Sequence, residues 1–355
     1  MSEERFRETR LANGVRVLSE AIPGVRSASA GVWVRRGSAH EAEEHLGVSH
    51  LLEHMVFKGT GTRSPRELAF ALERLGGALD AYTTREHTAY QARVLDTHLP
   101  EALDVLSDLV LDPVLRERDL ELEREVVLEE IAQVEDAPDN LVFELHGARL
   151  WNGHPYGRSI LGTPASVGEM SGEVLRGVHD RGYRGRSLVV AAAGRVDHQE
   201  LVARSRTLFG AVEPGEAPPP TPEAPATGRV GDERVERGTA QTHVVFGSVV
   251  PGHPHPDRYA IVLLASALGG GMSSRLFQRV REELGLCYSI FTYHSFWGEA
   301  GVAGTYLATR PATEEQAVAA VREELDRVAR EGLSPDEVEQ SKRRLKGQIM
   351  LSLES

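Results

Sequence analysis

Hydrophobic and polar residues alternate or recur at helical spacing along most of the chain, which predicts a mixture of strands and amphipathic helices. A strand hairpin is predicted over residues 11–35, because Asn13 and Gly14 form a strong tight-turn signal between alternating runs. A further strand is predicted at 188–193. Amphipathic helices are predicted at 65–75, 101–109 and 118–134.

A proline-rich stretch at 213–228 divides the chain. Its prolines stand among Gly, Ala and Thr with almost no large apolar residue, a composition typical of an extended, semi-rigid linker. Beyond it a strand is predicted at 242–250 and a helix at 259–268. The chain ends in LSLES without a helix-ending Gly or Pro, so we expect the second domain to be incomplete at its C-terminus. The predicted parts are a first domain at 1–212, the linker at 213–228 and a second domain at 229–355.

The two halves share a charged amphipathic helix, at 118–134 in the first and within 333–349 in the second. This echo favours two tandem, related α/β domains. The fold class predicted is α+β, with a mixed, mainly antiparallel sheet packed with helices in each domain.

Composition narrows the function classes. The chain has 355 residues, 41% of them hydrophobic and 26% charged, which is enough for two domains with buried cores. Its net charge of -13 disfavours a broad phosphate-binding surface, so we expect no nucleic-acid partner. Cys287 is the only cysteine, which excludes an intrachain disulfide. A charged N-terminus and the absence of any long apolar run predict a cytoplasmic protein with no membrane partner.

The segment 47–59, GVSHLLEHMVFKG, carries the most informative chemistry. Its Leu, Met and Val residues at helical spacing predict a helix, with Ser49 as the N-cap and Gly59 at the C-terminal cap. His50 and His54 lie one turn apart on one face of that helix. Their imidazoles can therefore bind a single metal ion, as in zinc sites.

Glu53 lies between the two histidines in the chain and on the adjacent face of the helix. Its carboxylate is placed to reach a water beside the metal without binding the metal, which is the position of a general base in a zinc hydrolase. A surface helix that contains two histidines and an acid by coincidence also fits. Composition alone predicts about 0.08 chance matches to this motif in the chain.

A zinc hydrolase needs a third protein ligand, and the predicted helix at 118–134 offers candidates. Glu123 and Glu130 fall within its apolar arc, whereas Glu129 falls on the face that meets solvent. Acidic residues are seldom buried unpaired, so a metal would account for two inward carboxylates. Both can also lie at the edge of the arc and reach water or an arginine.

These residues resemble the inverted zinc-binding motif of the pitrilysin-type metallopeptidases (inverzincins), most closely the mitochondrial processing peptidase branch and its bacterial relatives. HLLEH is followed, 76 residues after its second histidine, by the last glutamate of EREVVLEE. The resemblance covers nearly the whole chain. It continues through LDAYTTREHTAY at 79–90, HPYGRSILGT at 154–163 and GGGMSSRLFQRVREELGLCYSI at 269–290.

The resemblance assigns roles residue by residue. It makes His50, His54 and Glu130 the ligands of one zinc ion per chain. Glu53 becomes the base that activates water, and Glu123 supports the metal site from outside the ligand set.

The resemblance also implies a substrate strand and a contribution from the second domain. An extended substrate is expected to add to an edge strand, although the same run also fits a strand inside a sheet. Arg281 and Tyr288 match an Arg-x6-Tyr pair that reaches the active site in related enzymes. From the residues alone, Arg281 would be a solvated helix residue and Tyr288 a core aromatic. The residues expected on the edge strand are Asp80, Ala81, Tyr82 and Thr83.

In this family two such domains form half of a clamshell chamber. The resemblance therefore implies a zinc-dependent endopeptidase that acts on peptides or unfolded polypeptide segments, paired as a homodimer or as a heterodimer with a homologous chain. The competing hypothesis is a non-catalytic scaffold or partner subunit of a heteromeric peptidase. Members of that kind typically lose part of the zinc motif, which is complete here. Other histidines are expected to be structural or exposed: His40, His45, His87, His98, His146, His154 and His294.

Overall fold

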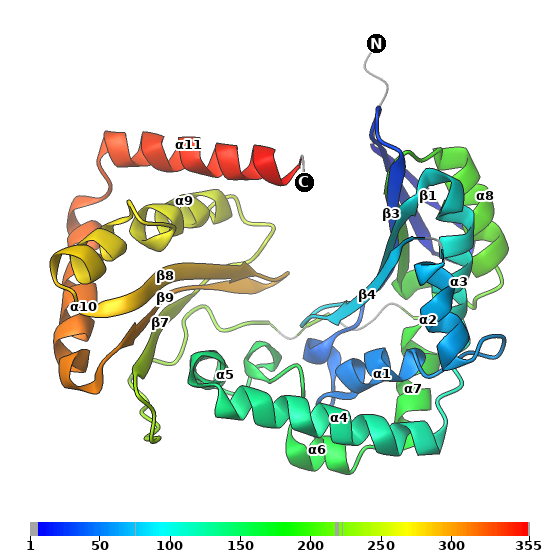
Figure 1. The fold of residues 1–355 in the computed structure, drawn as a ribbon, viewed down its shortest axis with the longest axis horizontal. Coiled ribbons are helices and arrows are strands. Elements are labelled where there is room, and N and C mark those ends of the chain that lie inside the picture. The colour runs from blue at the N-terminus through cyan, green and yellow to red at the C-terminus, as the bar shows by residue number, and fades with distance from the viewer. Residues whose placement is uncertain (1–5, 75, 217–219, 222, 354–355) are drawn as a thin grey trace. The chain divides into compact units, whose positions relative to one another are not determined.

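The computed structural model describes residues 6–74, 76–216, 220–221 and 223–353 (Figure 1). The chain divides into two units. The first consists of Met1–Gln133 and Arg158–Thr221, and the second of Val134–Gly157 and Pro222–Ser355. The second unit thus takes the segment Val134–Gly157 from within the range 1–212 that was predicted for the first domain. Residues 217–219 and 222 of the predicted linker lie outside the described residues.

One sheet of six strands forms the centre of the first unit, in the order β1-β2-β6-β3-β5-β4. Neighbouring strands are antiparallel except for β2 and β6, which are parallel. The mainly antiparallel sheet predicted from the sequence is therefore confirmed in this unit. The strands are β1 (Phe6–Arg10), β2 (Arg16–Ala21), β3 (Ser27–Val34), β4 (Ala78–Thr83), β5 (Thr88–Leu95) and β6 (Leu188–Gly194).

The hairpin predicted over 11–35 is confirmed in its turn but wrong in its strand pairing. Asn13 and Gly14 do form a turn, with Gly14 at a φ of 95°, but this turn joins β1 to β2. Strand β3 does not pair with β2, because β6 from much later in the chain lies between them. The strand predicted at 188–193 is confirmed as β6.

Helices cover this sheet and enclose the core of the first unit. Helices α3 and α8 pack on the sheet and against each other, and α1 contacts both α7 and the edge strand β4 (Figure 1). The three helices predicted in this half are confirmed within a few residues of their ends, although residue 75 lies outside the described range. The α-helices that begin in this unit are α1 (Val48–Val56), α2 (Pro65–Glu73), α3 (Leu99–Leu111), α4 (Glu117–Asp136), α6 (Pro164–Gly168), α7 (Gly172–Gly182) and α8 (His198–Phe209).

The second unit contains an antiparallel sheet of three strands in the order β7-β9-β8. Helix α9 packs on β8, α11 packs on α9, and α5 packs on β7, which explains why the segment that carries α5 belongs to this unit. The predicted strand at 242–250 and helix at 259–268 are confirmed as β7 and α9. The elements are α5 (Pro138–Trp151), β7 (Thr242–Pro251), α9 (Arg258–Gly269), a π-helix (Phe277–Glu283), β8 (Cys287–Phe296), β9 (Ala300–Thr309), α10 (Glu314–Glu331) and α11 (Pro335–Ser352).

Short 3-10 turns occur in both units. They lie at Ser38–His40, Glu43–His45, Asp96–His98, Pro155–Gly157, Gly185–Ser187 and Pro311–Thr313. Within the described residues, the helices are either too short or too polar to cross a membrane.

Candidate metal centre

Helix α1 carries both motif histidines, and its first turn differs from the prediction. The N-cap is Gly47, with a φ of 86°, and Ser49 is buried inside the helix. Glycine is needed there because a Cβ atom would lie 2.5 Å from the carbonyl oxygen of Leu161. The carboxylate of Glu41 takes the capping role, since the N–H groups of Gly47 and Ser49 each donate to it at 2.8 Å. The helix ends at Val56 with Phe57 as its C-cap, so the C-cap expected at Gly59 is wrong.

The apolar face of α1 fixes where the histidines point. Leu51, Leu52 and Met55 are fully buried in the core of the first unit, which anchors the helix. His50 and His54 therefore project together on another face, with ring centroids 4.7 Å apart. Two imidazoles at this spacing are placed to bind one metal ion together.

Helix α4 brings Glu130 to the same point. Its carboxylate oxygens lie 3.6 Å from Nε2 of His50 and 3.7 Å from Nε2 of His54, while Glu129 is exposed. Each of the three residues thus offers one ligand atom, and these atoms all lie within 4.8 Å of one another. Zinc bonds of roughly 2.0–2.2 Å in a tetrahedron separate neighbouring ligand atoms by about 3.3–3.6 Å, and the distances of 3.6 and 3.7 Å from Glu130 to the two histidines are close to this separation.

The surroundings of the two histidines suit metal binding. Burial, together with the charge of His54, lowers the pKa of His50 to about 4, which keeps its imidazole neutral at physiological pH. His54 is hydrogen-bonded through Nδ1 to Oε2 of Glu123 at 3.1 Å. Because a carboxylate can only accept, Nδ1 carries the proton and the lone pair of Nε2 faces Glu130.

Glu123 lies beside the site rather than in it. It is buried, and its other oxygen pairs with Nζ of Lys58 at 2.6 Å. Both carboxylate oxygens are therefore engaged, one by a lysine and one by the imidazole of His54. This contact explains how an acid can be buried on the inward face of α4, and it matches the supporting position expected for Glu123.

Glu53 is held by a residue of the neighbouring strand. The hydroxyl of Thr83 donates to Oε2 of Glu53 at 2.5 Å. Burial raises the pKa of Glu53 above its ordinary value, the Thr83 hydrogen bond opposes that rise, and the charges of Glu130 and Asp80 add to it. A carboxylate with a raised pKa beside a metal site is a suitable general base.

The strand β4 that carries Thr83 is the last strand in the sheet order and so lies at its edge. The alternative that residues 80–83 form a strand inside the sheet is therefore wrong. A cleft of about 290 Å³ opens beside it, between α1, β4 and α4. The cleft is lined by Glu53, His54, Phe57, Lys58, Leu79, Asp80, Ala81 and Glu123.

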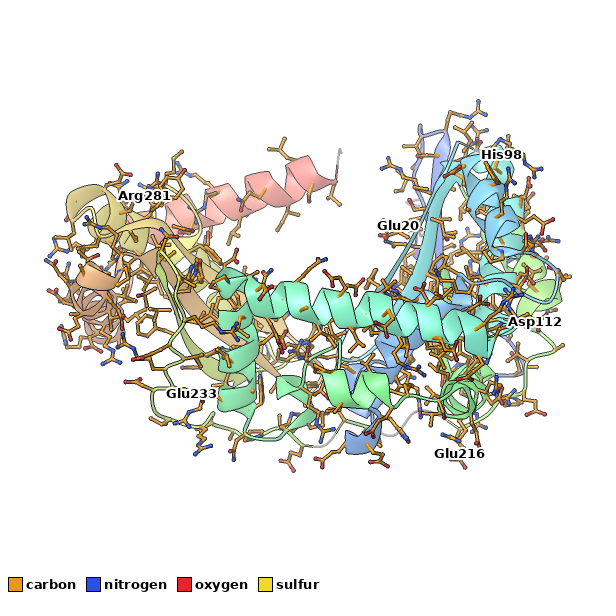
Figure 2. The ribbon with its side chains drawn as sticks, turned by 60° about the horizontal axis from the view of Figure 1, so that its bottom comes forward. Glu20, His98, Asp112, Glu216, Glu233 and Arg281 are labelled. Carbon is orange, nitrogen blue, oxygen red and sulfur yellow. The ribbon has the colours of Figure 1, made fainter. Side chains whose placement is uncertain are left out.

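The second unit carries the two remaining predicted residues. Arg281 lies in the π-helix, at the surface of this unit in Figure 2, and its guanidinium is 4.4 Å from the ring of Phe277 and 5.0 Å from that of Tyr288. Tyr288 is 78% exposed, so the core position expected from the residues alone is wrong. The exposed ring and the guanidinium instead form one surface feature, and their part in catalysis stays a prediction.

Comparison with known proteins supplies the family. Residues 16–164 match the model described as insulinase (peptidase family M16), and residues 169–345 match the peptidase M16 inactive domain. An uncharacterized zinc protease of Streptomyces coelicolor is 41% identical over 98% of this chain and 77% of its own length. The chain belongs to peptidase family M16. The resemblance drawn from the sequence is thereby confirmed.

Other M16 relatives agree. Uncharacterized zinc proteases of Mycobacterium tuberculosis and Bacillus subtilis are 42% and 39% identical, over 98% and 97% of this chain and 80% and 83% of theirs. Two solved structures share the fold at a TM-score of 0.91 and 22% identity: a peptidase M16 inactive domain from Pseudomonas fluorescens and a protease from Helicobacter pylori. They cover 96% and 99% of this chain, and 83% and 86% of their own chains are matched. The predicted tandem pair of α/β domains is confirmed.

Sequence reasoning missed three contacts of the M16 centre. These are the cap from Glu41 to α1, the pairing of Lys58 with Glu123, and the hydrogen bond from Thr83 to Glu53. Each joins residues that are far apart in the chain or on different elements, so no local pattern signals them.

Proposed function

We propose that this M16 chain is a zinc-dependent endopeptidase that cuts peptides or unfolded polypeptide segments. The observation that carries the proposal is the convergence of His50, His54 and Glu130 on one point, with Glu53 beside them. Three protein ligands with a neighbouring carboxylate base are typical of hydrolytic zinc sites, where the fourth position serves water or substrate.

His50, His54 and Glu130 would hold one zinc ion per chain. When bound, zinc lowers the pKa of water to about 7 and polarises a carbonyl group, which is the chemistry that peptide hydrolysis needs. Glu123 keeps His54 in the tautomer that offers Nε2 to the metal. Its contact with Lys58 holds the carboxylate in place for that task.

Glu53 acts as the general base of the proposed reaction. It accepts a proton from the attacking water and delivers that proton to the amine that leaves when the peptide bond breaks. The hydroxyl of Thr83 fixes the orientation of the carboxylate and leaves one oxygen, Oε1, for this proton transfer. Burial favours the protonated form, which helps the carboxylate to accept the proton from water in the first half of the transfer.

The edge strand β4 is where we expect an extended substrate to bind. Its outer edge can pair with a peptide main chain, which gives affinity across many sequences because backbone groups make the contacts. The strand also lines the cleft that contains Glu53 and His54. A peptide added along Asp80, Ala81 and Tyr82 would thus pass beside the proposed metal ion.

The competing role of a non-catalytic partner subunit is less well supported. A scaffold has no need of a complete ligand set, and still less of a half-buried carboxylate base to which a hydroxyl donates at 2.5 Å. The experiment is cleavage of unstructured peptides with blocked ends, after removal of metal with a chelator and again after addition of zinc. The proposal expects cleavage that chelation abolishes and one equivalent of zinc restores. Full zinc binding without cleavage would favour the partner subunit.

A further inference from the structure

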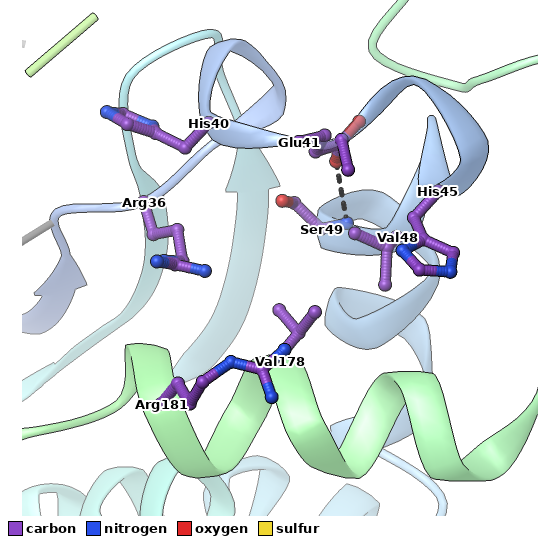
Figure 3. A pocket seen from close by; sticks show the side chains of 9 residues that line it. Arg36, His40, Glu41, His45, Val48, Ser49, Val178 and Arg181 are labelled. Carbon is purple, nitrogen blue, oxygen red and sulfur yellow. Dashed lines mark hydrogen bonds between the residues drawn. The ribbon is translucent and has the colours of Figure 1, made fainter. Parts of the chain in front are cut away.

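A second cavity in the first unit lies beside the first turn of α1 and against α7. It has a volume of about 150 Å³. Figure 3 shows Arg36 and Arg181 turned toward this space, with Ser49 of α1 and His45 on other sides of it. The reaction proposed for the zinc site uses none of these side chains. His45, which was expected to be structural or exposed, is half-buried and lines this cavity.

Arg36 and Arg181 stand in this cavity without a compensating acid. Across the part of the chain that the structure describes, neither guanidinium forms an ion pair, and Nε of Arg36 is buried without a hydrogen-bond partner. Burial lowers the pKa of Arg36, and the positive charge of Arg181 lowers it further. Two like charges that line one cavity repel each other, and an anion between them would remove that repulsion.

The backbone is shaped to admit Arg36. A Cβ atom on Gly182 of α7 would lie 2.8 Å from Cδ of Arg36 and 3.2 Å from its Nε. Gly182 therefore leaves the room through which the arginine reaches the cavity. The guanidinium is held by packing rather than lying loosely on the surface.

Glu41 also lines the cavity but does not neutralise the arginines. Its two carboxylate oxygens accept the N–H groups of Gly47 and Ser49, and Figure 3 marks the second of these bonds. Burial raises the pKa of Glu41 to about 7, so its negative charge is incomplete at neutral pH. Positive charge therefore dominates the cavity on the side of α7.

We propose that this cavity binds a small oxyanion, for which inorganic phosphate has the fitting chemistry. Planar guanidinium groups bind phosphate oxygens through paired charge-assisted hydrogen bonds, and Arg36 and Arg181 supply two such groups. A single water needs roughly 10–15 Å³ of such space, so 150 Å³ accommodates an ion with four oxygens. The site is separate from the proposed zinc ligands and does not depend on peptidase activity.

The test is isothermal titration of inorganic phosphate into the zinc-loaded full chain, in a buffer free of other oxyanions. We expect saturable binding of one phosphate per chain at millimolar concentration or below. Arg181→Gln should weaken that binding by about tenfold or more, since a hydrogen bond to a charged group is lost. Arg181 is exposed, so this variant should fold normally. Arg206→Gln, an exposed arginine on α8, removes the same charge elsewhere and should leave the affinity within about twofold.

Two further titrations separate the alternatives. Gly182→Ala leaves the net charge unchanged but should weaken phosphate binding, because the new methyl group displaces Arg36. Acetate should bind more weakly than phosphate if the site fits a tetrahedral oxyanion, and equal or tighter binding of acetate would assign the cavity to a carboxylate instead. Absence of saturable phosphate binding overturns the proposal. So does binding that neither Arg181→Gln nor Gly182→Ala weakens, because the ion would then lie elsewhere, as on the zinc.

Discussion

Glu129 and Glu130 are neighbours in the chain, yet only one of them reaches the histidines. The carboxylate of Glu130 lies 3.6 Å from Nε2 of His50, while Glu129 is exposed on α4. We predict that Glu130→Gln lowers zinc occupancy by about tenfold or more, because a neutral amide replaces an anionic ligand. Glu129→Gln is the matched control and should bind zinc like the wild type. Metal analysis of the purified variants checks this, and equal loss in both would show that the register of α4 is wrong.

Thr83 offers a second comparison at the residue scale. Thr83→Val keeps the shape of the side chain but removes the hydroxyl that holds Glu53. We predict a fall in kcat of about tenfold with KM and zinc content close to the wild type, because the base loses its orientation while the ligands stay intact. Thr83→Ser keeps a hydroxyl and should retain most of the activity. A Val variant as active as the Ser variant would mean that the hydrogen bond does not matter for catalysis.

At the scale of elements, helix α1 illustrates what a local pattern can and cannot predict. Its apolar spacing placed the helix and both histidines correctly. Its N-cap was wrong, because Gly47 is required by the backbone at Leu161 and the capping carboxylate comes from Glu41 in the preceding loop. Neither contact is encoded within the helix. Ser49, a good N-cap by residue type, is buried in the first turn instead.

The Glu41 cap predicts a pH dependence of stability. The pKa of Glu41 is raised from 4.5 to about 7, so its contribution to folding is complete below 4.5 and is lost as the pH rises through about 7. A shift of that size corresponds to about 3 kcal/mol. The stability advantage of the wild type over Glu41→Gln should therefore shrink between pH 5 and pH 8, as measured by urea unfolding. An advantage that is the same at both pH values would contradict a buried, raised carboxyl group.

Over the whole molecule, the local sequence pattern predicted where helices and strands lie in the chain, but it did not predict which elements pack or pair with one another. Strand β6 was predicted within one residue, but its place between β2 and β3 depends on pairing across most of the first unit. Helix α5 likewise follows α4 in the chain yet belongs to the second unit, because it packs on β7. The zinc motif could be found because the ligands on α1 lie one helical turn apart. The family resemblance, rather than geometry, selected Glu130 from the two inward glutamates of α4.

Arg281 and Tyr288 provide the prediction for the second unit. If their expected role in the reaction is right, Arg281→Ala should lower kcat/KM by about tenfold or more, because a positively charged group that positions substrate is lost. Zinc content and thermal stability should stay close to the wild type, since the side chain is partly exposed and contacts only the rings of Phe277 and Tyr288 and, at 3.8 Å, the carboxylate of Glu282 among the described residues. Arg279→Ala, two residues earlier in the same helix and paired with Glu283, is the control and should have little effect. Similar activity losses in both variants would assign Arg281 a structural role.

The central claim is that Glu53 performs chemistry at a zinc ion that other residues hold. The most direct measurement compares Glu53→Gln with the wild type for both zinc content and peptide hydrolysis. One zinc per chain should remain, because His50, His54 and Glu130 are intact, while hydrolysis should fall by about 10²-fold or more with the base removed. A variant that loses zinc together with activity would make Glu53 a ligand. A variant that keeps both would contradict the account altogether.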